Sequence, residues 1–381
     1  MLAGPYATML LADLGADVVK VEPPGGDNTR RVGPFRDGDG PEALGGYFQS
    51  VNRGKRGVVL DLKTDDGRDG FLDLVSHADI VAENFSTGVM DRLGLGYEQL
   101  RAVNPRLVYA AIRGFGDPRT GRSPYADWPA FDVVAQAMGG FLSITGTAEG
   151  VPVKSGPGIG DLFPAALLAF GIVSAVHDAQ RTGEGQFVDV AMYDAVLSLS
   201  ERIVYQHSYT GEIPGRQGNS HPMLCPFDIL ATADGWVALA APSDRHWRMI
   251  AETIGRPDMA DDPRYRHNHD RSRNSRDVRE AIEAWLRTRT NEQAVSQLGG
   301  RVPIGPVNDV SAIFADPHTE ARQMLAHVQQ PGSDRPVTIA GQPIKMSKTP
   351  SEITRRAPLL GEHDAREIAS RWADDTRASG H

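Results

Sequence analysis

The chain has 381 residues, of which 40% are hydrophobic and 23% charged, which is typical of a globular protein and excludes a disordered one. The formal net charge is −9 and no block of Lys or Arg stands out, so nucleic-acid binding is disfavoured, although local cations can still hold an anionic ligand. One cysteine, Cys225, excludes an intrachain disulfide. No basic segment followed by an apolar one opens the chain, so we expect a cytoplasmic protein.

The first half of the chain alternates helices and strands. The predicted strands are 16–22, 57–62, 79–84, 107–112 and 187–190, and the predicted helices are 6–14, 65–78, 97–103, 131–141 and 161 to about 180, with another from Met192. Several strands are continuous apolar runs, which argues for a parallel sheet covered on both faces. Ligands gather at the carboxyl ends of such strands, and these ends are at Glu22, Lys63, Asn84 and Arg113.

The pattern of predicted helices and strands changes in the second half of the chain. Residues 205–222 are polar and punctuated by glycine, which indicates a linker. Residues 227–241 read as two short strands around the turn Ala233-Asp234-Gly235. Helices are predicted at 245–254, 274–287 and 291–298. This part therefore indicates a smaller α+β domain.

Glycine and proline crowd the stretch Lys154-Ser155-Gly156-Pro157-Gly158-Ile159-Gly160-Asp161, which leads into the longest apolar run, 162–176. That run is shorter than the roughly 18–20 residues that span a bilayer, so we predict a buried helix. Pro164 suits a first helical turn, which places Asp161 at or near the helix N-terminus, where the dipole favours its ionised form. Two interpretations stay open: an ordinary N-cap, or an exposed carboxylate on a glycine platform that acts as a nucleophile.

Several kinds of site are disfavoured. The sequence holds no phosphate-binding loop, no dinucleotide-binding glycine motif and no hydrolase nucleophile elbow. His267 and His269 flank Asn268 in a charged loop, where solvated surface is favoured over a metal site. A pair of His221 with Cys225 is weighed against a lone buried thiol, which is favoured. No metal site is predicted.

A set of motifs, in order along essentially the whole chain, resembles the class III CoA-transferases, which include formyl-CoA and carnitine CoA-transferases and 2-methylacyl-CoA racemases. Each motif alone is modest, and the ordered set carries the resemblance. The motifs are Ala3-Gly4-Pro5-Tyr6, 11–24, Asn52-Arg53-Gly54-Lys55-Arg56, Leu60-Asp61-Leu62-Lys63, Glu83-Asn84-Phe85, Asp91-Arg92-Leu93-Gly94-Leu95, Gly114-Phe115-Gly116, 131–136 and 356–363.

The resemblance implies an enzyme that moves CoA from an acyl-CoA donor to a carboxylic acid acceptor. Asp161 is then the nucleophile, which forms an aspartyl anhydride and an aspartyl-CoA thioester in turn. Backbone N–H groups near the helix start are candidates to stabilise the oxyanion. No cofactor is bound permanently, because the coenzyme A thioester is a substrate.

The resemblance also assigns residues to CoA. Lys63 and Arg92 match positions near the nucleotide, where ordinary surface charge is the alternative. Asn84 and Phe85 match a segment along the pantetheine arm. Leu60 either packs on the adenine or belongs to the core of its strand.

The implied architecture is a Rossmann-like large domain over 1–200, a linker at 201–222, a small domain over 223–310, a second linker at 311–330 and a return to the large domain over 331–381. Two chains are expected to interlock as a homodimer, with no membrane or nucleic-acid partner. The family has a further strand ahead of Ala3, so a truncated chain, a misassigned start and a missing strand are the open explanations.

Two other functions remain as alternatives. A branch of the family racemises 2-methylacyl-CoA with a His/Asp pair, and Phe131 stands at the position of its histidine. Phenylalanine cannot carry a proton, which disfavours racemisation. His207 or His221 could replace it from the linker. The second alternative is a non-catalytic protein that binds acyl-CoA.

Overall fold

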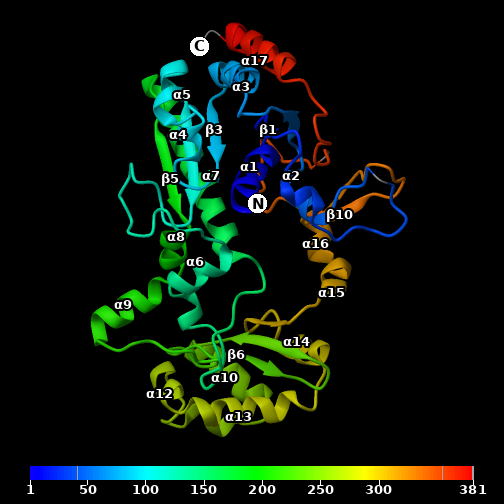
Figure 1. Ribbon diagram of the computed structural model, residues 1–381. Helices are drawn as coiled ribbons and strands as arrows, with labels where there is room; N and C mark the ends of the chain where they lie inside the picture. Colours follow the sequence, from blue (N-terminus) through cyan, green and yellow to red (C-terminus); the bar gives the residue numbers. More distant parts are fainter. Residues whose placement is uncertain (41, 354, 380–381) are drawn as a thin grey trace. The chain divides into compact units, whose positions relative to one another are not determined.

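The computed structural model describes residues 1–40, 42–353 and 355–379, which form two compact units. Unit 1 consists of Met1–Phe141, Lys154–Gly211 and Pro317–His381, and unit 2 consists of Leu142–Val153 and Glu212–Asp316. Each unit therefore combines segments that are distant in the sequence. Figure 1 labels most of the helices and several of the strands of both units.

Unit 1 is built on parallel strands, as the apolar runs predict. β1 (Val19–Glu22) pairs with β2 (Arg56–Val59) in one sheet, and β4 (Val108–Arg113) lies between β3 (Ile80–Glu83) and β5 (Phe187–Ala191) in another. Every residue of β4 is buried, which explains its uninterrupted apolar sequence. Within the described residues, β1 and β3 each pair on one side only, so the parallel strands form two sheets and not the single sheet that we expect from the sequence.

Helices cover both sides of these strands (Figure 1). α1 (Ala3–Asp13), α7 (Ile159–Thr182) and α8 (Met192–Leu199) share one apolar core with β4. α3 (Asp65–His77), α4 (Val89–Arg92) and α5 (Tyr97–Val103) share another with the opposite side of β4, and α17 (Ala365–Ser379) packs on α3 and β2. The other elements of unit 1 are α2 (Gly46–Asn52), α6 (Asp132–Met138), α9 (Glu201–Thr210), α16 (Pro317–Ala321), β9 (Leu325–Val328), β10 (Val337–Ala340) and the 3₁₀ turns η1 (Asn28–Arg31) and η2 (Phe141–Ser143), the last of which runs into unit 2.

The motif Asn52-Arg53-Gly54-Lys55-Arg56 holds α1 in place. Arg53 forms a buried ion pair with Asp13 at 2.7 Å, which joins the end of α2 to the end of α1. The buried Lys55 Nζ donates to the carbonyl groups of Pro5 and Val51 and to Asn52 Oδ1 at 2.8–3.0 Å. Desolvation lowers the pKa of Lys55 well below its ordinary value. These residues therefore act in the fold of unit 1, where they fasten α1.

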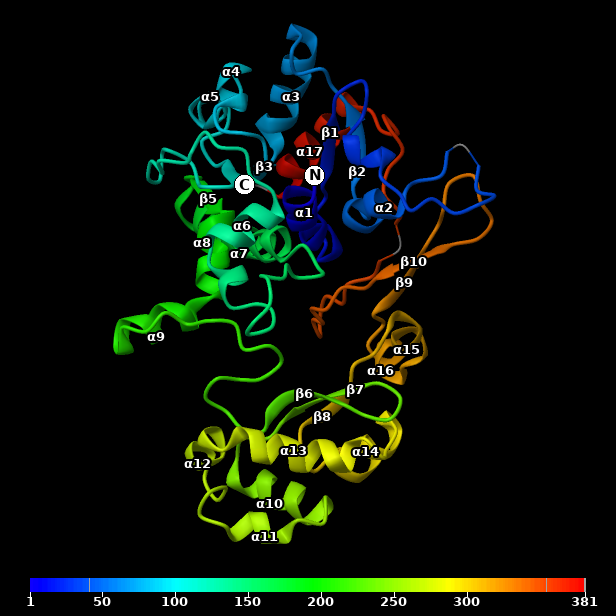
Figure 2. The ribbon, with the colours of Figure 1, turned by 60° about the horizontal axis from the view of Figure 1, so that its bottom comes forward.

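Unit 2 is the smaller unit and has the α+β character that the predicted elements of the second half of the chain indicate. β6 (Phe227–Ala231), β7 (Trp236–Ala240) and β8 (Ile304–Pro306) form an antiparallel sheet, with a tight turn between the first two strands as predicted. Figure 2 shows this sheet above α13 and α14. Buried side chains of the strands and helices, such as Val237, Trp247 and Ile282, share one apolar core. Its helices are α10 (Asp244–Thr253), α11 (Pro257–Asp261), α12 (Asn268–Arg273), α13 (Ser275–Leu286), α14 (Asn291–Leu298) and α15 (Val310–Ala315).

Two local expectations are wrong. α7 begins at Ile159, so Pro164 is its sixth residue and lies beyond the first turn. Because proline has no N–H, the carbonyl of Gly160 receives no hydrogen bond from it. The polar segment at 201–222, expected as a linker, contains the helix α9, none of whose described side chains is buried.

Candidate active site

Asp161 is the third residue of α7 and lies in its first turn, as the sequence predicts. The N-cap is Gly158, which has no side chain to offer, so the interpretation of Asp161 as an ordinary N-cap is wrong. Among the described residues, no hydrogen bond to the carboxylate of Asp161 is found, and its side chain is half-buried. The carboxylate is therefore available to another molecule.

Burial, and secondarily the negative charge of Asp132, raise the pKa of Asp161 from its ordinary value to about 6, although the amine of Met1 acts in the opposite direction. The helix dipole favours the ionised form, but it does not outweigh burial here. At pH 7 the group is still about nine-tenths ionised. Asp161 is thus a charged but unusually basic carboxylate, as a nucleophile at neutral pH should be.

Asp132 supplies the cap that Gly158 lacks. It is the first residue of α6, and its Oδ1 accepts the N–H of Gly160 at 2.7 Å. Both of its oxygens also accept from Gln136 Nε2 at 2.9 Å. Gln136 is buried, and its Oε1 accepts the N–H of Ser155 at 3.0 Å, which fixes the loop ahead of α7. Two side chains of α6 therefore hold the entry to α7.

Of the glycines that precede Asp161, Gly160 is the one that close packing requires. A Cβ atom there would lie 2.5 Å from the backbone oxygen of Asp132, closer than any real contact. Gly158 is less crowded, since a Cβ atom would meet Leu2 at 3.3 Å. In contrast, a Cβ atom on Gly156 would meet nothing within 4 Å. Gly160 is thus required for the close approach of α6 to α7.

The N–H groups of the first turn of α7 are all engaged. Gly160 donates to Asp132, and the other three donate to backbone carbonyl groups: Ile159 to Pro157, and Asp161 and Leu162 to Gly158. The expectation that these groups stabilise an oxyanion is therefore wrong for this arrangement of the chain, because each already has an acceptor.

Asn84 and Phe85 directly follow β3, at the carboxyl end of a parallel strand, as predicted. Asn84 lies against Gly4 of α1, where a Cβ atom would come within 2.9 Å of its Oδ1. Phe85 exposes 48% of its surface, and its N–H donates to Glu83 at 2.7 Å. Asn84 therefore lies against the first turn of α1, the helix that packs along α7.

A buried ion-pair network supports this end of the sheet. Arg113, at the end of β4, binds Glu83 and also Asp117, the latter at 2.6 Å. Arg119 joins Asp117 to Asp91 of α4 at 3.1 and 2.6 Å. Burial raises the pKa of Glu83, and the positive charge of Arg113 opposes that shift. The sequence does not predict this network, because its members come from β3, α4, β4 and the loop after β4.

The structure places the remaining predicted CoA residues at the ends of β2 and α4. Leu60 is half-buried and packs against the cores beneath α3 and α17, which supports its interpretation as part of the core. Lys63 is exposed in the turn before α3, and Arg92 is exposed at the end of α4. No contact joins either cation to Asp161 within the described residues, so their assignment to the nucleotide stays a prediction.

A family model named CoA-transferase family III matches residues 1–364. The chain belongs to this family. It is 55% identical to the succinyl-CoA:mesaconate CoA-transferase of Haloarcula hispanica over 96% of this chain and 92% of that protein. It is 39% identical to the succinate–glutarate CoA-transferase of Agrobacterium fabrum, over 97% of this chain and 92% of that protein.

Solved structures agree with the family III assignment. A CAIB/BAIF family protein from Brucella suis superimposes with a TM-score of 0.83 at 34% identity, over 97% of this chain and 96% of that chain. Rv3272 from Mycobacterium tuberculosis also superimposes with a TM-score of 0.83, at 30% identity, over 96% of this chain and 94% of that one. The mixed α/β fold with parallel sheets is therefore that of the family.

Phe131 precedes Asp132 at the N-cap of α6 in this family III chain and exposes 62% of its surface. Its ring offers no group that moves a proton. Of the two alternatives from the linker, His207 lies in α9, and His221 accepts the N–H of Met223 through Nδ1. No contact between His207 and Asp161, which both belong to unit 1, is found in the part of the chain that the structure describes.

The other candidate chemistry of the sequence is accounted for in unit 2. His267 binds Asp244 at 2.8 Å, and His269 lies 3.3 Å from Asp270. Cys225 is buried, and burial raises the pKa of its thiol to about 12, so it is an inert core residue. No group of three His, Cys, Asp or Glu side chains that could hold a metal occurs among the described residues.

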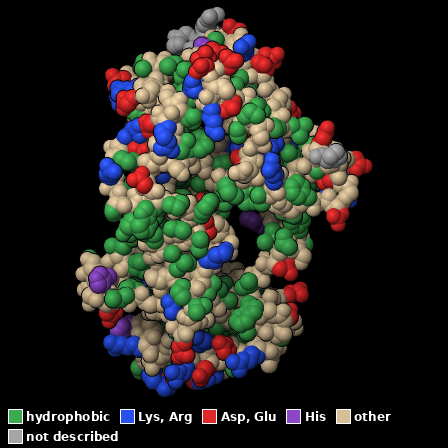
Figure 3. Space-filling view, in the orientation of Figure 1, with side chains coloured by type: hydrophobic (Ala, Val, Ile, Leu, Met, Phe, Trp, Pro, Cys, Tyr) green, Lys and Arg blue, Asp and Glu red, His purple; other side chains and the backbone are tan. Residues whose placement is uncertain are grey.

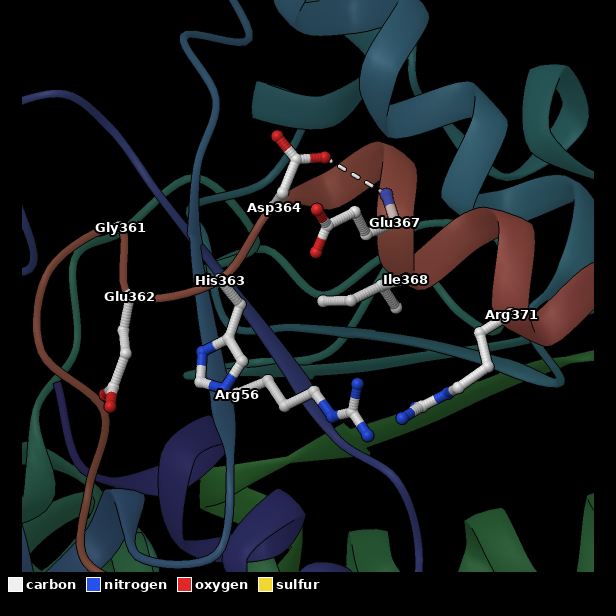
Figure 4. A pocket seen from close by; sticks show the side chains of 8 residues that line it. All are labelled: Arg56, Gly361, Glu362, His363, Asp364, Glu367, Ile368 and Arg371. Atoms are coloured by element: carbon white, nitrogen blue, oxygen red, sulfur yellow. Dashed lines mark hydrogen bonds between the residues drawn. The ribbon is translucent and has the colours of Figure 1, made fainter.

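A cavity of about 530 Å³ lies at the start of α17, away from the predicted site residues, none of which lines it. Figure 4 shows Arg56 and Arg371 converging there beside His363. Both guanidinium groups bind the single carboxylate of Asp17. Glu367 and two further acidic residues line the cavity as well, so its charges are largely balanced.

Proposed function

We propose that this chain is a CoA-transferase in which Asp161 carries the acyl group and then CoA. The observation that carries the proposal is the carboxylate of Asp161, which receives no hydrogen bond within the described residues and whose pKa is raised to about 6. Such a group is ionised at neutral pH and is more nucleophilic than an ordinary aspartate, because nucleophilicity rises with basicity.

The proposed reaction has four steps. Asp161 Oδ attacks the thioester carbonyl of the donor, the C–S bond breaks and CoA leaves as the thiolate, which produces a mixed anhydride. The thiolate attacks the aspartyl carbonyl carbon, so the donor acid leaves as a carboxylate and Asp161 carries CoA as a thioester. The acceptor carboxylate attacks this thioester, releases the thiolate and forms a second anhydride. The thiolate then attacks the acceptor's acyl carbon and restores the Asp161 carboxylate.

The proposed substrates are short dicarboxylic acids and their CoA thioesters. The names of the curated relatives contain succinate, mesaconate, glutarate or oxalate at 39–55% identity, among them an acetyl-CoA:oxalate CoA-transferase of Acetobacter aceti at 41%. Succinyl-CoA as donor and mesaconate as acceptor are the first pair to test. Lys63, Asn84, Phe85 and Arg92 are the residues proposed to contact CoA, in a cytoplasmic enzyme without a permanently bound cofactor.

The decisive test compares wild type with Asp161→Ala. Wild type incubated with succinyl-CoA and mesaconate should produce mesaconyl-CoA, and the enzyme should gain the mass of CoA on Asp161. The variant should lose transfer by at least about a thousandfold and still bind CoA. Near-normal turnover in the folded variant would overturn the mechanism. Binding without transfer by wild type would favour the acyl-CoA-binding alternative.

The racemase alternative has its own test, which rests on Phe131. A 2-methylacyl-CoA in deuterated water, without an acceptor acid, should show no incorporation of deuterium at Cα, since a two-base exchange needs a second group with a usable pKa. Rapid incorporation would favour the racemase branch of the family and contradict the transferase proposal.

We also propose a homodimer, in which two chains interlock. α7 buries one side against α1, β4 and β5, as the core helix of a globular unit does, although it is long and apolar enough to cross a membrane. Its other side exposes Phe170 by 74% and Val173 by 56%. Figure 3 shows hydrophobic side chains gathered near α8. Leu197 and Leu199 of α8 are also exposed, by 36% and 37%. A patch of this kind marks an interaction surface. A stable, active monomer in dilute light scattering would contradict the proposal.

A further inference from the structure

We propose that Asp132 is a positioning residue for Asp161: it caps α7 from the neighbouring helix, and its charge favours the covalent states in which Asp161 is neutral. The inference rests on the function proposed above. It concerns a residue to which neither the resemblance nor the relatives' names assign a role, and it separates two effects that one carboxylate can have, one geometric and one electrostatic.

The geometric effect follows from the hydrogen bonds of Asp132. Its Oδ1 accepts from Gly160, the residue directly before the nucleophile, at 2.7 Å. The backbone of the same two residues is in close contact, because any side chain on Gly160 would meet the Asp132 carbonyl oxygen at 2.5 Å. Gln136 fills the remaining side of the carboxylate and ties it to the loop before α7. α6 thus holds the backbone directly before Asp161.

The electrostatic effect follows from the groups that face Asp161. Asp132 comes from α6, Tyr47 from α2, and the Met1 amine from the start of the chain. Lys20 and Asp27, whose ion pair measures 2.7 Å, act in turn on the pKa of the Met1 amine. Of the groups in direct interaction with Asp161, Asp132 is the anion. Its hydrogen bonds stabilise its own charge, whereas Asp161 has no donor in the described part of the chain.

This repulsion acts differently on the free and the covalent enzyme. In the free enzyme two negative charges face each other in a partly desolvated site, which raises the free energy of that state. In the anhydride and in the aspartyl-CoA thioester, Asp161 carries no charge, so the repulsion from Asp132 disappears. Asp132 therefore shifts the equilibrium toward the covalent intermediates through its charge.

The first experiment observes Asp161 directly and needs no turnover. Protein labelled with ¹³C at the aspartate carboxyl groups is titrated by NMR, and the Asp161 signal is assigned by its loss in Asp161→Asn. The Asp132→Asn variant keeps an oxygen for the Gly160 N–H but loses the charge. The midpoint of the Asp161 titration should fall by about one pH unit in that variant. An unchanged midpoint in folded Asp132→Asn would overturn the proposal.

Gln136→Leu is the matched control, because it removes the hydrogen bonds to Asp132 and to the loop but no charge. Its Asp161 midpoint should stay within about 0.3 units of wild type, even where its thermal stability falls. Should Asp132→Asn fail to fold, Asp132→Glu provides the second variant: it retains the charge on a longer side chain, and it should retain a raised midpoint. A normal midpoint in Asp132→Glu would contradict the electrostatic role.

The second experiment measures the covalent state. The enzyme is mixed with succinyl-CoA, quenched in acid, and weighed by intact mass spectrometry. The ratio of CoA-bearing to free enzyme should fall about tenfold in Asp132→Asn, in line with a shift of one pH unit, and kcat should fall more than KM changes. An equal ratio would overturn the proposal. If wild type turns over without any adduct on Asp161, the proposed function fails, and the NMR titration still decides whether Asp132 acts on Asp161.

Discussion

Two helices of this protein begin in opposite ways. α14 of unit 2 starts with a complete capping box, in which Thr290 accepts from the backbone of Gln293 and the Gln293 side chain accepts from the backbone of Thr290. Two residues that are three positions apart thus satisfy the hydrogen-bonding needs of each other's backbone N–H groups. α7 of unit 1 starts at a glycine and receives its capping carboxylate from Asp132, which lies 28 residues earlier in the sequence.

The difference shows what a helix start needs when it carries a nucleophile. A local side-chain cap would occupy the space at the N-terminus of α7 and would place a further hydrogen-bonding group beside Asp161. A cap supplied by α6 leaves that space free and places a second carboxylate behind the first. The start of α14 is therefore a stabilising device, and the start of α7 trades stability for a basic, accessible carboxylate.

The largest expected effect concerns the loss of stability caused by the basic carboxylate at the start of α7. The pKa of Asp161 in the folded protein, about 6, lies above its ordinary value of 3.8, so the folded state holds the proton more tightly than the unfolded state. Ionisation of Asp161 therefore destabilises the fold as the pH rises from about 4 through 6, by up to about 3 kcal/mol at pH 7. Asp161→Asn should raise the free energy of unfolding at pH 7, although it abolishes transfer.

Chemical denaturation of wild type and Asp161→Asn at pH 4.0 and 7.0 measures this difference, which should shrink toward the lower pH. The control is Asp178→Asn in the same helix, where the exposed carboxylate binds Arg181 at 2.8 Å and should change the free energy of unfolding by less than about 0.5 kcal/mol. Equal stability of wild type and Asp161→Asn at pH 7 would show that the start of α7 is no more costly than that of α14.

The next effect tests the contact between α6 and α7. Gly160→Ala places a Cβ atom where the oxygen of Asp132 lies 2.5 Å away, so the helices must separate. We expect the free energy of unfolding to fall by about 1–3 kcal/mol and kcat to fall more than about tenfold. Gly156→Ala is the matched control, since its Cβ atom meets nothing within 4 Å. Wild-type activity of Gly160→Ala would contradict the close approach.

A smaller effect is expected at the locally capped helix. Thr290→Ala removes the side-chain oxygen that accepts from Gln293, which should lower the free energy of unfolding by about 1 kcal/mol. Transfer by the variant, assayed with succinyl-CoA and mesaconate, should match wild type, because α14 lies in the core of unit 2. A change in kcat without a change in stability would mean that α14 is not a purely structural helix.

The smallest effect is expected from a substitution that makes the start of α7 resemble the locally capped start of α14. Gly158→Ser offers α7 a local side-chain oxygen at a φ of −73°, outside the left-handed region, although its Cβ atom would meet Leu2 at 3.3 Å. Serine replaces glycine at an N-cap with a gain of only a few tenths of a kcal/mol. Thermal unfolding should therefore barely change, whereas kcat should fall if the hydroxyl competes with Asp132 for the N–H of Gly160. Unchanged kcat would show that a local cap is compatible with the site.

Local patterns predicted most of the helices and strands. The helix 97–103 and the helix 291–298 have the bounds that the sequence predicts, and β4 follows from a run of apolar residues. α7 begins two residues before the predicted start at Asp161, because Pro164 lies beyond its first turn. The helix α9 was missed, since its polar residues carry no clear periodicity and none of its described side chains is buried.

The amino-acid sequence by itself determined the parallel α/β character of unit 1, the antiparallel sheet of unit 2 and the position of Asp161 in the first turn of a long apolar helix. These follow from hydrophobic periodicity and from glycine and proline, which act over a few residues. Only the tertiary structure decided the surroundings of Asp161. Asp132, Gln136 and Gly160 are separated by up to 28 residues, and their hydrogen bonds exist only where α6 and α7 pack together. Burial and charge repulsion depend on distances through space, so the raised pKa of Asp161 could not be obtained from the order of residues along the chain.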